Sequence, residues 1–192
     1  MDKLKNIWKI EHEEKISTSV EKLWELITSP SNLELFHPFC KSNKVIAWPG
    51  KNSIDELIYL NDLKYIRSFI SWEEFKGYSL LIGEENQKQS YVIWKIYKKQ
   101  GLVFLKITIY PYFLRDIPKA ISYLPYKLFV IPKMTSYLKS VIGGINYYVE
   151  KKKENTKKIF RKPQMVFLKK FVFGINFGSK SIYNYNEKGK FI

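Results

Sequence analysis

The chain has 192 residues, 45% of them hydrophobic and 17% aromatic, which suits one domain with a substantial core. Large aromatic side chains fill cores, and they also line cavities that take apolar ligands. Cys40 is the only cysteine, so an intramolecular disulfide and a metal site built from cysteines alone are excluded. The N-terminal residues lack the continuous apolar stretch of a secretory signal, and no stretch reaches the roughly 18 apolar residues of a transmembrane helix. A soluble cytoplasmic protein is therefore expected.

The net charge of +15 is distributed unevenly. Residues 1–112 carry 16 Lys and Arg against 14 Asp and Glu, a net +2, whereas residues 113–192 carry 17 against 4, a net +13. The densest basic stretch is 151–162, and the pair Lys169 and Lys170 follows it. Such a segment can attract the phosphates of anionic lipid or nucleic acid, or it can be a solvated tail.

The first part of the chain contains one predicted strand and two predicted short helices. Alternating apolar and polar residues predict a strand over residues 7–16. Ser19 ends a run of hydroxyl residues that offer helix N-caps, and the apolar spacing after it predicts a helix over residues 19–28. A proline then opens a second short helix over residues 31–36, which ends at His37 because another proline follows.

Beyond this point helical periodicity disappears and period-two alternation replaces it. Six strands are predicted, over residues 44–48, 53–60, 64–75, 78–83, 90–97 and 102–112. Consecutive strands joined by short turns indicate an antiparallel meander.

The C-terminal part of the predicted domain is mainly helical. Residues 113–132 hold three prolines among apolar residues without a clean period, so we expect either an irregular lid or ordinary packing there. The clearest helix follows over residues 133–150. Gly144 and the glycine before it are expected to permit a close approach of the sheet or a slight bend. The chain thus divides into a folded domain, residues 1–151, and a basic aromatic extension, residues 152–192.

Three stretches of the chain together resemble a known family: KISTSVEKLWELITSPSNLELFHPFCKSNKVI (15–46), GLVFLKITIYPYF (101–113) and YLKSVIGGINYYVEKKK (137–153). They resemble the START-related lipid-transfer, polyketide cyclase and pollen-allergen superfamily (SRPBCC), and the resemblance covers about residues 5–152. It implies an α+β helix-grip fold, in which a curved antiparallel sheet of about seven strands wraps around a long C-terminal helix. The two short helices would follow the first strand. The resemblance also implies an apolar ligand in the space between helix and sheet.

The ligand-binding residues predicted on this basis lie on alternating strand positions and on the facing helix stripe: Val92, Trp94, Ile96, Leu105, Ile107, Ile109, Tyr137, Val141, Ile145 and Tyr148. These apolar positions need a partner surface, and only the predicted 133–150 helix is long enough to supply it. Whether the two surfaces close into a dry core or leave a cavity stays open at this stage. Residues 113–132 would lie at the cavity mouth.

The predicted 64–75 strand has two different faces. Arg67 shares one face with Tyr65 and Glu73, and Trp72 lies on the other. If the Tyr65 face is the inner one, Arg67 could fix the acidic head group of a ligand. If it is the outer one, Arg67 is a surface arginine and Trp72 faces the cavity or core. Arg67 and Trp72 therefore both join the predicted ligand-binding residues.

Catalytic motifs are scarce in the sequence. It has two histidines, His12 and His37, and no zinc-type cluster, Walker loop, dinucleotide fingerprint or nucleophile elbow. His37 and Cys40 are three residues apart, but the proline between them disfavours a thiol–imidazole pair, so Cys40 is predicted to be a small, partly buried hydrophobe. The candidates for a positioned acid or base are Tyr65, Arg67 and Glu73. No metal and no cofactor are predicted.

The leading functional prediction is noncatalytic binding or transport of a hydrophobic small molecule, such as a lipid, an isoprenoid or a polyketide. One alternative is an enzyme of the polyketide cyclase or hydratase kind. Another is a lipid-binding protein at an anionic membrane surface, peripherally attached through residues 151–162 and the pair Lys169 and Lys170. Nucleic acid ranks last as a partner because no recognised module appears.

Overall fold

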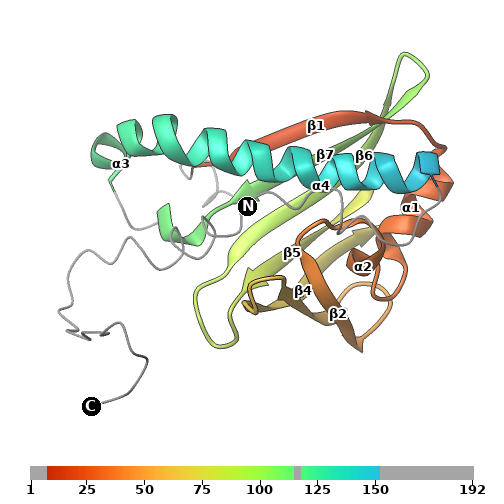
Figure 1. Cartoon of the computed structure of the whole chain (residues 1–192), viewed down its shortest axis with the longest axis horizontal. Helices are drawn as coiled ribbons and strands as arrows, with labels where there is room; N and C mark the ends of the chain where they lie inside the picture. Colours follow the sequence, from red (N-terminus) through yellow and green to blue (C-terminus); the bar gives the residue numbers. More distant parts are fainter. Residues whose placement is uncertain (1–7, 115–117, 152–192) are drawn as a thin grey trace, which may run out of the picture.

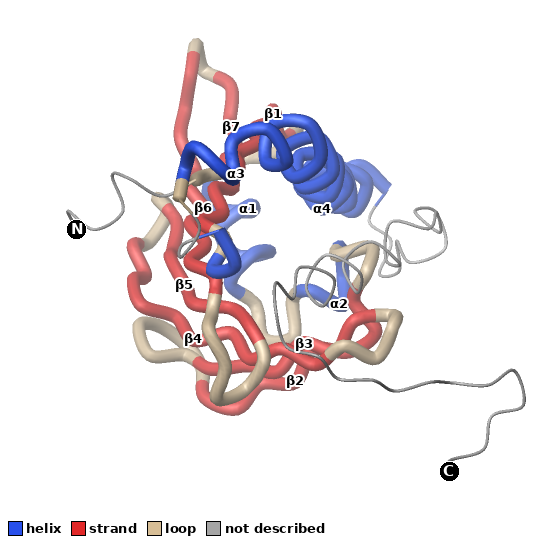
Figure 2. The backbone as a smooth tube through the Cα atoms, turned by 90° about the vertical axis from the view of Figure 1, so that its left-hand side faces the viewer, coloured by secondary structure: helices blue, strands red, loops and turns tan. Residues whose placement is uncertain are grey.

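The computed structural model of the chain describes residues 8–114 and 118–151. In this part of the chain, seven strands form one antiparallel sheet that curves around a long C-terminal helix (Figures 1 and 2). The strands are β1 (Ile10–Ile16), β2 (Cys40–Ala47), β3 (Ile54–Tyr59), β4 (Lys64–Glu73), β5 (Gly77–Gly83), β6 (Ser90–Lys99) and β7 (Leu102–Tyr110). The helical elements are α1 (Val20–Thr28), α2 (Leu33–Phe36), the 3-10 turn η2 (Tyr112–Leu114), α3 (Lys119–Pro125), the π-helical turn η3 (Tyr126–Val130) and α4 (Ile131–Lys151). The predicted extension, with Lys169 and Lys170, lies outside the described residues.

The sheet has the order β1-β7-β6-β5-β4-β3-β2. Strands β2 to β7 form the predicted meander, and β1 pairs antiparallel to β7, with Ile10 opposite Ile109. Helix α4 lies across the concave face, while α1 and α2 close one end of the sheet (Figure 1). The predicted architecture, a curved sheet gripping a C-terminal helix with two short helices after the first strand, is confirmed.

The N-terminal helices form where the sequence predicted them. Ser19 caps α1, because its Oγ accepts a hydrogen bond from the backbone N–H of Lys22 at 3.3 Å. The apolar stripe of α1 is buried against the sheet. Helix α2 ends at His37, whose backbone N–H donates to the carbonyl of Leu33 at 2.9 Å.

Strand β2 begins at Cys40, four residues before the predicted start of the strand over 44–48. The early residues are polar and carried no period-two signal, yet Asn43 is only 2% exposed. Its side chain accepts from the backbone N–H of Leu33 at 3.4 Å and donates to the carbonyl of Glu56 at 3.2 Å. These hydrogen bonds compensate for burial of the amide, so a polar residue occupies a buried strand position.

The prediction of an irregular segment over 113–132 is wrong. Apart from residues 115–117, which are not described, the segment is helical and continues directly into α4. Pro118 lies just before α3, where no helical hydrogen bond is lost. Pro125 and Pro132 lie within the continuous helical run, on either side of the π-helical turn η3, where the regular hydrogen-bond pattern is already interrupted.

Gly144 brings α4 into backbone contact with α2. A Cβ atom placed on Gly144 would lie 2.0 Å from the carbonyl oxygen of Phe36, closer than real atoms approach. The expected close approach therefore exists, but its partner is the end of α2 rather than the sheet. Through this contact α4 is fixed beside His37, the residue that follows Phe36.

Candidate functional site

A cavity of about 110 Å³ lies between the first half of α4 and the concave face of the sheet, and it is partly open to solvent. Its apolar lining from the sheet comprises Leu57, Leu80, Ile82, Val92, Trp94, Ile107 and Ile109. From α4 it comprises Met134, Tyr137, Leu138 and Val141, and from η2 it comprises Tyr112 and Phe113. The volume is smaller than the roughly 150 Å³ of an engineered cavity that holds benzene. The enclosed part therefore takes a group no larger than about one small ring or a short alkyl chain, and a larger ligand would extend through the open side.

The predicted site residues fall into two groups. The cavity lining contains Arg67, Val92, Trp94, Ile107, Ile109, Tyr137 and Val141. The lining does not contain Trp72, Ile96, Leu105, Ile145 and Tyr148. Ile96, Leu105 and Ile145 are at most 4% exposed, because the second half of α4 packs directly on the sheet. A cavity lies between the first half of α4 and the sheet, whereas the second half packs against the sheet without one. The packed core and the cavity, which the sequence left open as alternatives, therefore both occur.

A β-bulge explains where Trp72 lies. The register between β4 and β5 shifts between Phe69 and Ser71, so one extra residue of β4 changes which side chains share a face. Trp72 stands opposite Tyr78 and its ring stacks on that tyrosine, with centroids 5.9 Å apart. Beyond the bulge Trp72 therefore joins the face of Arg67, at the end of the sheet where Trp24 of α1 covers it.

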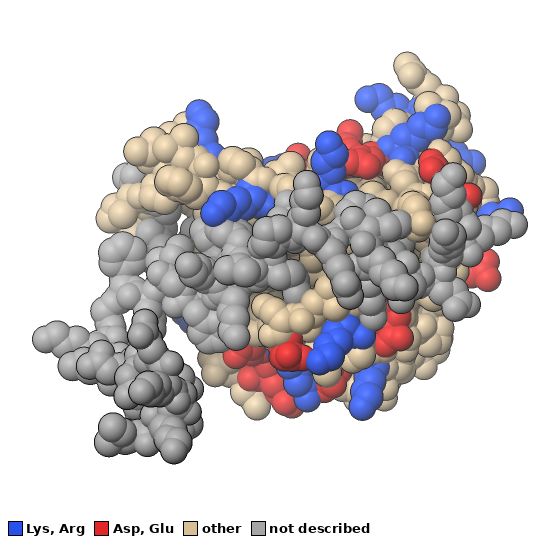
Figure 3. Space-filling model, in the orientation of Figure 1, with Lys and Arg blue, Asp and Glu red and all other residues tan. Residues whose placement is uncertain are grey.

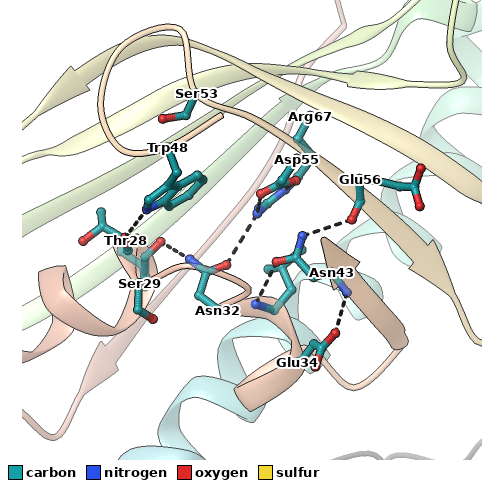
Figure 4. A network of polar contacts seen from close by, with 12 residues as sticks. Thr28, Ser29, Asn32, Glu34, Asn43, Trp48, Ser53, Asp55, Glu56 and Arg67 are labelled. Atoms are coloured by element: carbon teal, nitrogen blue, oxygen red, sulfur yellow. Dashed lines mark hydrogen bonds and ion pairs between the residues drawn. The ribbon is translucent and has the colours of Figure 1, made fainter. Parts of the chain in front are cut away.

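Arg67 is buried, with 2% of its surface exposed, and it is paired with a carboxylate that is equally buried. Its Nε donates to Oδ1 of Asp55 at 2.7 Å and its Nη2 donates to Oδ2 of the same residue (Figure 4). Burial lowers the pKa of the guanidinium, but the charge of Asp55 and these hydrogen bonds outweigh burial and raise it. The expectation of a surface arginine is therefore wrong. The charge that lines the cavity is already neutralised by a carboxylate of this chain.

The ion pair also ties the sheet to the helices. Nη2 of Arg67 donates to Oδ1 of Asn32 at 3.4 Å, and Nδ2 of Asn32 donates to the carbonyl of Ile27 in α1. Asn32 is fully buried in the turn between α1 and α2. Figure 4 shows how these contacts, with those of Asn43, connect the helix pair to β3 and β4. This arrangement is structural and uses most of the donors of Arg67.

A second polar group faces the cavity from three separate elements. His37 at the end of α2, Tyr59 of β3 and Tyr137 of α4 all line the cavity. Nε2 of His37 lies 2.9 Å from the hydroxyl of Tyr137, which lies 3.4 Å from the hydroxyl of Tyr59. We refer to these three residues as the hydroxyl cluster. Sequence reasoning placed Tyr137 on the inner helix stripe but missed His37 and Tyr59. His37 and Tyr137 are 100 positions apart in the sequence, and no local pattern connects them.

Burial keeps the hydroxyl cluster uncharged. It lowers the pKa of His37 to about 3, and the positive charge of Arg67 acts in the same direction. Burial raises the pKa of Tyr137 to about 12 and that of Tyr59 well above its usual value. At neutral pH the imidazole is therefore neutral and both phenols keep their protons.

The partners of the cluster fix its protons. Nδ1 of His37 accepts from the backbone N–H of Phe39 at 3.3 Å, so the single proton of the neutral ring is on Nε2 and is donated to Tyr137. Of the two tyrosine hydroxyls, one donates to the other. The remaining hydroxyl proton has no acceptor among the hydrogen bonds of the described residues. The cluster can therefore donate one further hydrogen bond into the cavity.

The structure does not bring the three candidate acid or base residues together. Tyr65 lines the cavity, as Arg67 does. Burial of the Tyr65 hydroxyl is the main cause that raises its pKa, and the electrostatic interaction with Tyr59 is the second. Glu73 lies at the exposed end of β4, with Nζ of Lys76 3.9 Å from its carboxylate. His37 uses its ring nitrogens with Phe39 and Tyr137, and Cys40 is fully buried rather than partly buried as predicted.

Two features are absent from the described residues. Within residues 8–114 and 118–151, no three His, Cys, Asp or Glu side chains gather in a way that could hold a metal ion. None of the helices in the same ranges is long and apolar enough to cross a membrane.

Solved structures with the same fold share little sequence with this chain. The crystal structure of DynU16, from the dynemicin biosynthetic locus, matches with a TM-score of 0.59 and 10% identity over 76% of this chain, which spans about half of that chain (48%). The crystal structure of Ara h 8.0201 matches with a TM-score of 0.56 and 15% identity, covering 76% of this chain and 99% of that one. The crystal structure of TTHA0849 from Thermus thermophilus matches with a TM-score of 0.58 and 15% identity, covering 74% and 97%. No protein-family model and no curated protein matches the sequence. The resemblance that the sequence suggested is thus confirmed at the level of the helix-grip fold.

Proposed function

We propose that this chain binds an uncharged, largely apolar small molecule whose oxygen atom accepts a hydrogen bond from the hydroxyl cluster. The observation that carries the proposal is the combination of an apolar cavity with one unused hydroxyl proton at its wall. Burial of the ligand's apolar surface supplies most of the affinity, on the order of 25 cal/mol per Å² before entropic costs. The hydroxyl proton supplies orientation.

Charge decides which end groups fit. Asp55 neutralises Arg67, and the buried imidazole of His37 stays uncharged. A carboxylate in the cavity would thus lose its hydration without gaining a counter-charge, which is costly. A carbonyl, ether or hydroxyl oxygen loses less on burial and accepts the spare proton. This argues against the acidic head group that the sequence allowed for Arg67.

The geometry supports binding better than catalysis. A general acid or base works best when its pKa is near the working pH. The pKa of His37 is about 3 and that of Tyr137 is about 12, so neither group exchanges protons readily near neutrality. The polar groups therefore serve as hydrogen-bonding partners, and the cyclase or hydratase alternative has no suitable proton carrier among them.

Titration of the full chain with three small aromatic probes, followed by NMR chemical shifts, tests this proposal. Acetophenone carries an acceptor oxygen, isopropylbenzene has a similar shape without it, and benzoate is anionic. We expect acetophenone and isopropylbenzene to shift signals of the cavity residues, and benzoate to bind at least about tenfold more weakly at pH 7 because its charge is buried unpaired. Equal or tighter binding of benzoate would contradict the proposal.

A cavity-filling variant supplies the matched control. Val141 is 2% exposed and lines the cavity from α4. In Val141→Trp the larger side chain occupies the space, so both neutral probes should lose binding while the fold is kept. Binding that survives this substitution would place the probes elsewhere. Native mass spectrometry of the purified chain, with extraction of any bound compound, then identifies the natural ligand.

A further inference from the structure

The segment formed by α3 and η3 presents an unusual amount of apolar surface to solvent. Of the eleven large hydrophobic side chains that are exposed among the described residues, five lie between positions 121 and 129. Ile121, Leu124, Leu128 and Phe129 are 70%, 62%, 57% and 56% exposed. Ile121, Leu124 and Leu128 are spaced by three and four residues, which places them along one side of the helical segment, and Phe129 adjoins Leu128. We call these four residues the α3 patch.

The opposite side of the same segment is fixed to the domain. Tyr126 and Val130 are at most 3% exposed. The ring of Tyr126 stacks on Trp8 with centroids 4.2 Å apart, and its hydroxyl donates to the carbonyl of Lys9. The segment therefore packs through one side and keeps the α3 patch turned outward. Because the inner side already has its partner, the patch is not a core face awaiting closure within the described part of the domain.

The charged residues of the segment itself are all lysines, and the nearby carboxylate of Glu11 lies toward Tyr126 on the buried side. Residues 118–139 contain four lysines and no Asp or Glu. Lys127 and Lys133 are exposed, and the ammonium of Lys127 lies 5.5 Å from the ring centroid of Tyr123 at the edge of the patch. Figure 3 shows basic side chains bordering the uncharged surface at the end of the molecule where α3 lies. Apolar residues flanked by lysine and tyrosine are typical of segments that lie in the interface of an anionic membrane.

We propose that the α3 patch docks on an anionic phospholipid bilayer, with its apolar side chains inserted among the acyl chains and its lysines at the head groups. The predicted basic run 151–162 has the same sign, but the proposal rests on the described residues 121–133. It does not depend on the ligand of the cavity. It does place the cavity close to the bilayer, because the segment joins η2 to α4 and both contribute to the cavity wall.

Binding of the full chain to vesicles tests the affinity. Vesicles of phosphatidylcholine with phosphatidylserine should sediment the protein, and the binding should weaken with added salt and on vesicles of phosphatidylcholine alone. Leu124→Gln/Leu128→Gln should bind at least about tenfold more weakly, because two apolar side chains no longer enter the bilayer. Ile46→Gln/Ile70→Gln, which changes exposed apolar residues of β2 and β4, is the matched control and should bind as the unchanged protein does. No binding, or equal loss in both variants, would overturn the proposal.

An environment-sensitive dye distinguishes insertion from attraction by charge alone. Cys40 is fully buried, so a cysteine introduced by Leu128→Cys can be labelled selectively. The dye at position 128 should report an apolar environment when phosphatidylserine vesicles are added, whereas a dye on Ile46→Cys should not. Vesicle binding without a change at position 128 would assign the contact to another part of the chain. A concentration-dependent dimer that Leu124→Gln/Leu128→Gln abolishes would assign the patch to a second copy instead.

Discussion

Two buried polar groups lie against the helix pair α1–α2. They differ in charge and in how many of their hydrogen-bond donors have a partner within the chain. Asp55 and Arg67 form an ion pair whose charges cancel and whose donors and acceptors are largely used within the chain. The hydroxyl cluster is uncharged and keeps one proton without an internal acceptor. Arg67 and the hydroxyl cluster both line the cavity, but the charge of Arg67 is already paired, whereas the cluster keeps a proton that a ligand can accept. The ion pair holds the helices on the sheet, and the hydroxyl cluster is the part of the polar wall left for a ligand.

Breaking the ion pair should have the largest effect. Asp55→Asn keeps the shape of the side chain but leaves the Arg67 charge buried without a partner, which should lower the free energy of unfolding by about 3–5 kcal/mol. Urea denaturation followed by circular dichroism measures the change. Because natural domains are stable by only about 5–15 kcal/mol, the loss should also lower the midpoint of thermal unfolding measurably.

The double variant Arg67→Met/Asp55→Leu separates charge from packing. It removes both charges and fills the space with apolar atoms, so most of the lost stability should return. If the double variant is as unstable as Asp55→Asn, the hydrogen bonds to Asn32 and the shape of the site matter more than the unpaired charge.

The hydroxyl cluster should make stability depend on pH. The unfolded chain binds a proton on His37 near its ordinary pKa of 6.5, whereas the folded chain binds one only near pH 3. Between these values the unfolded state holds more protons, so stability falls as the pH falls through this window. His37 alone should cost about 2 kcal/mol between pH 7 and pH 5. Urea denaturation at both values should show a smaller loss in His37→Gln, whose amide can replace both hydrogen bonds. An equal loss in the two proteins would mean that the folded state admits the proton.

The sequence predicted the fold better than the site for a physical reason. Period-two and helical patterns act over neighbouring residues, so the strands, α1 and α4 were found, and the apolar wall at Val92, Trp94 and Ile107 followed from them. The bulge before Ser71 left no local signal, and therefore the face of Trp72 was misjudged. Proline content made the α3–η3 segment look irregular, because no local pattern showed that a π-helical turn would follow Pro125 within a continuous helical run. The ion pair could have been predicted from two adjacent carboxylates, Asp55 and Glu56, on β3. Side chains alternate between the faces of a strand, so one of the two must point inward, toward the side of the sheet where Arg67 of the neighbouring β4 lies.

The smallest effect should come from removing the two hydroxyls of the cluster. Tyr59→Phe/Tyr137→Phe deletes the donor proposed to face the ligand and keeps the aromatic wall, so acetophenone should bind about tenfold more weakly while isopropylbenzene binds as before. The NMR titration that compares the two probes measures this. Tyr97→Phe, which removes a surface hydroxyl bonded to Glu13, is the matched control and should change neither affinity. The Nε2–H of His37 remains in the double variant, 2.9 Å from the position of the lost Tyr137 oxygen. If acetophenone and isopropylbenzene lose affinity equally, the hydroxyls support the cavity wall instead of contacting the ligand. The hydroxyl cluster would then have a structural role, as the ion pair does.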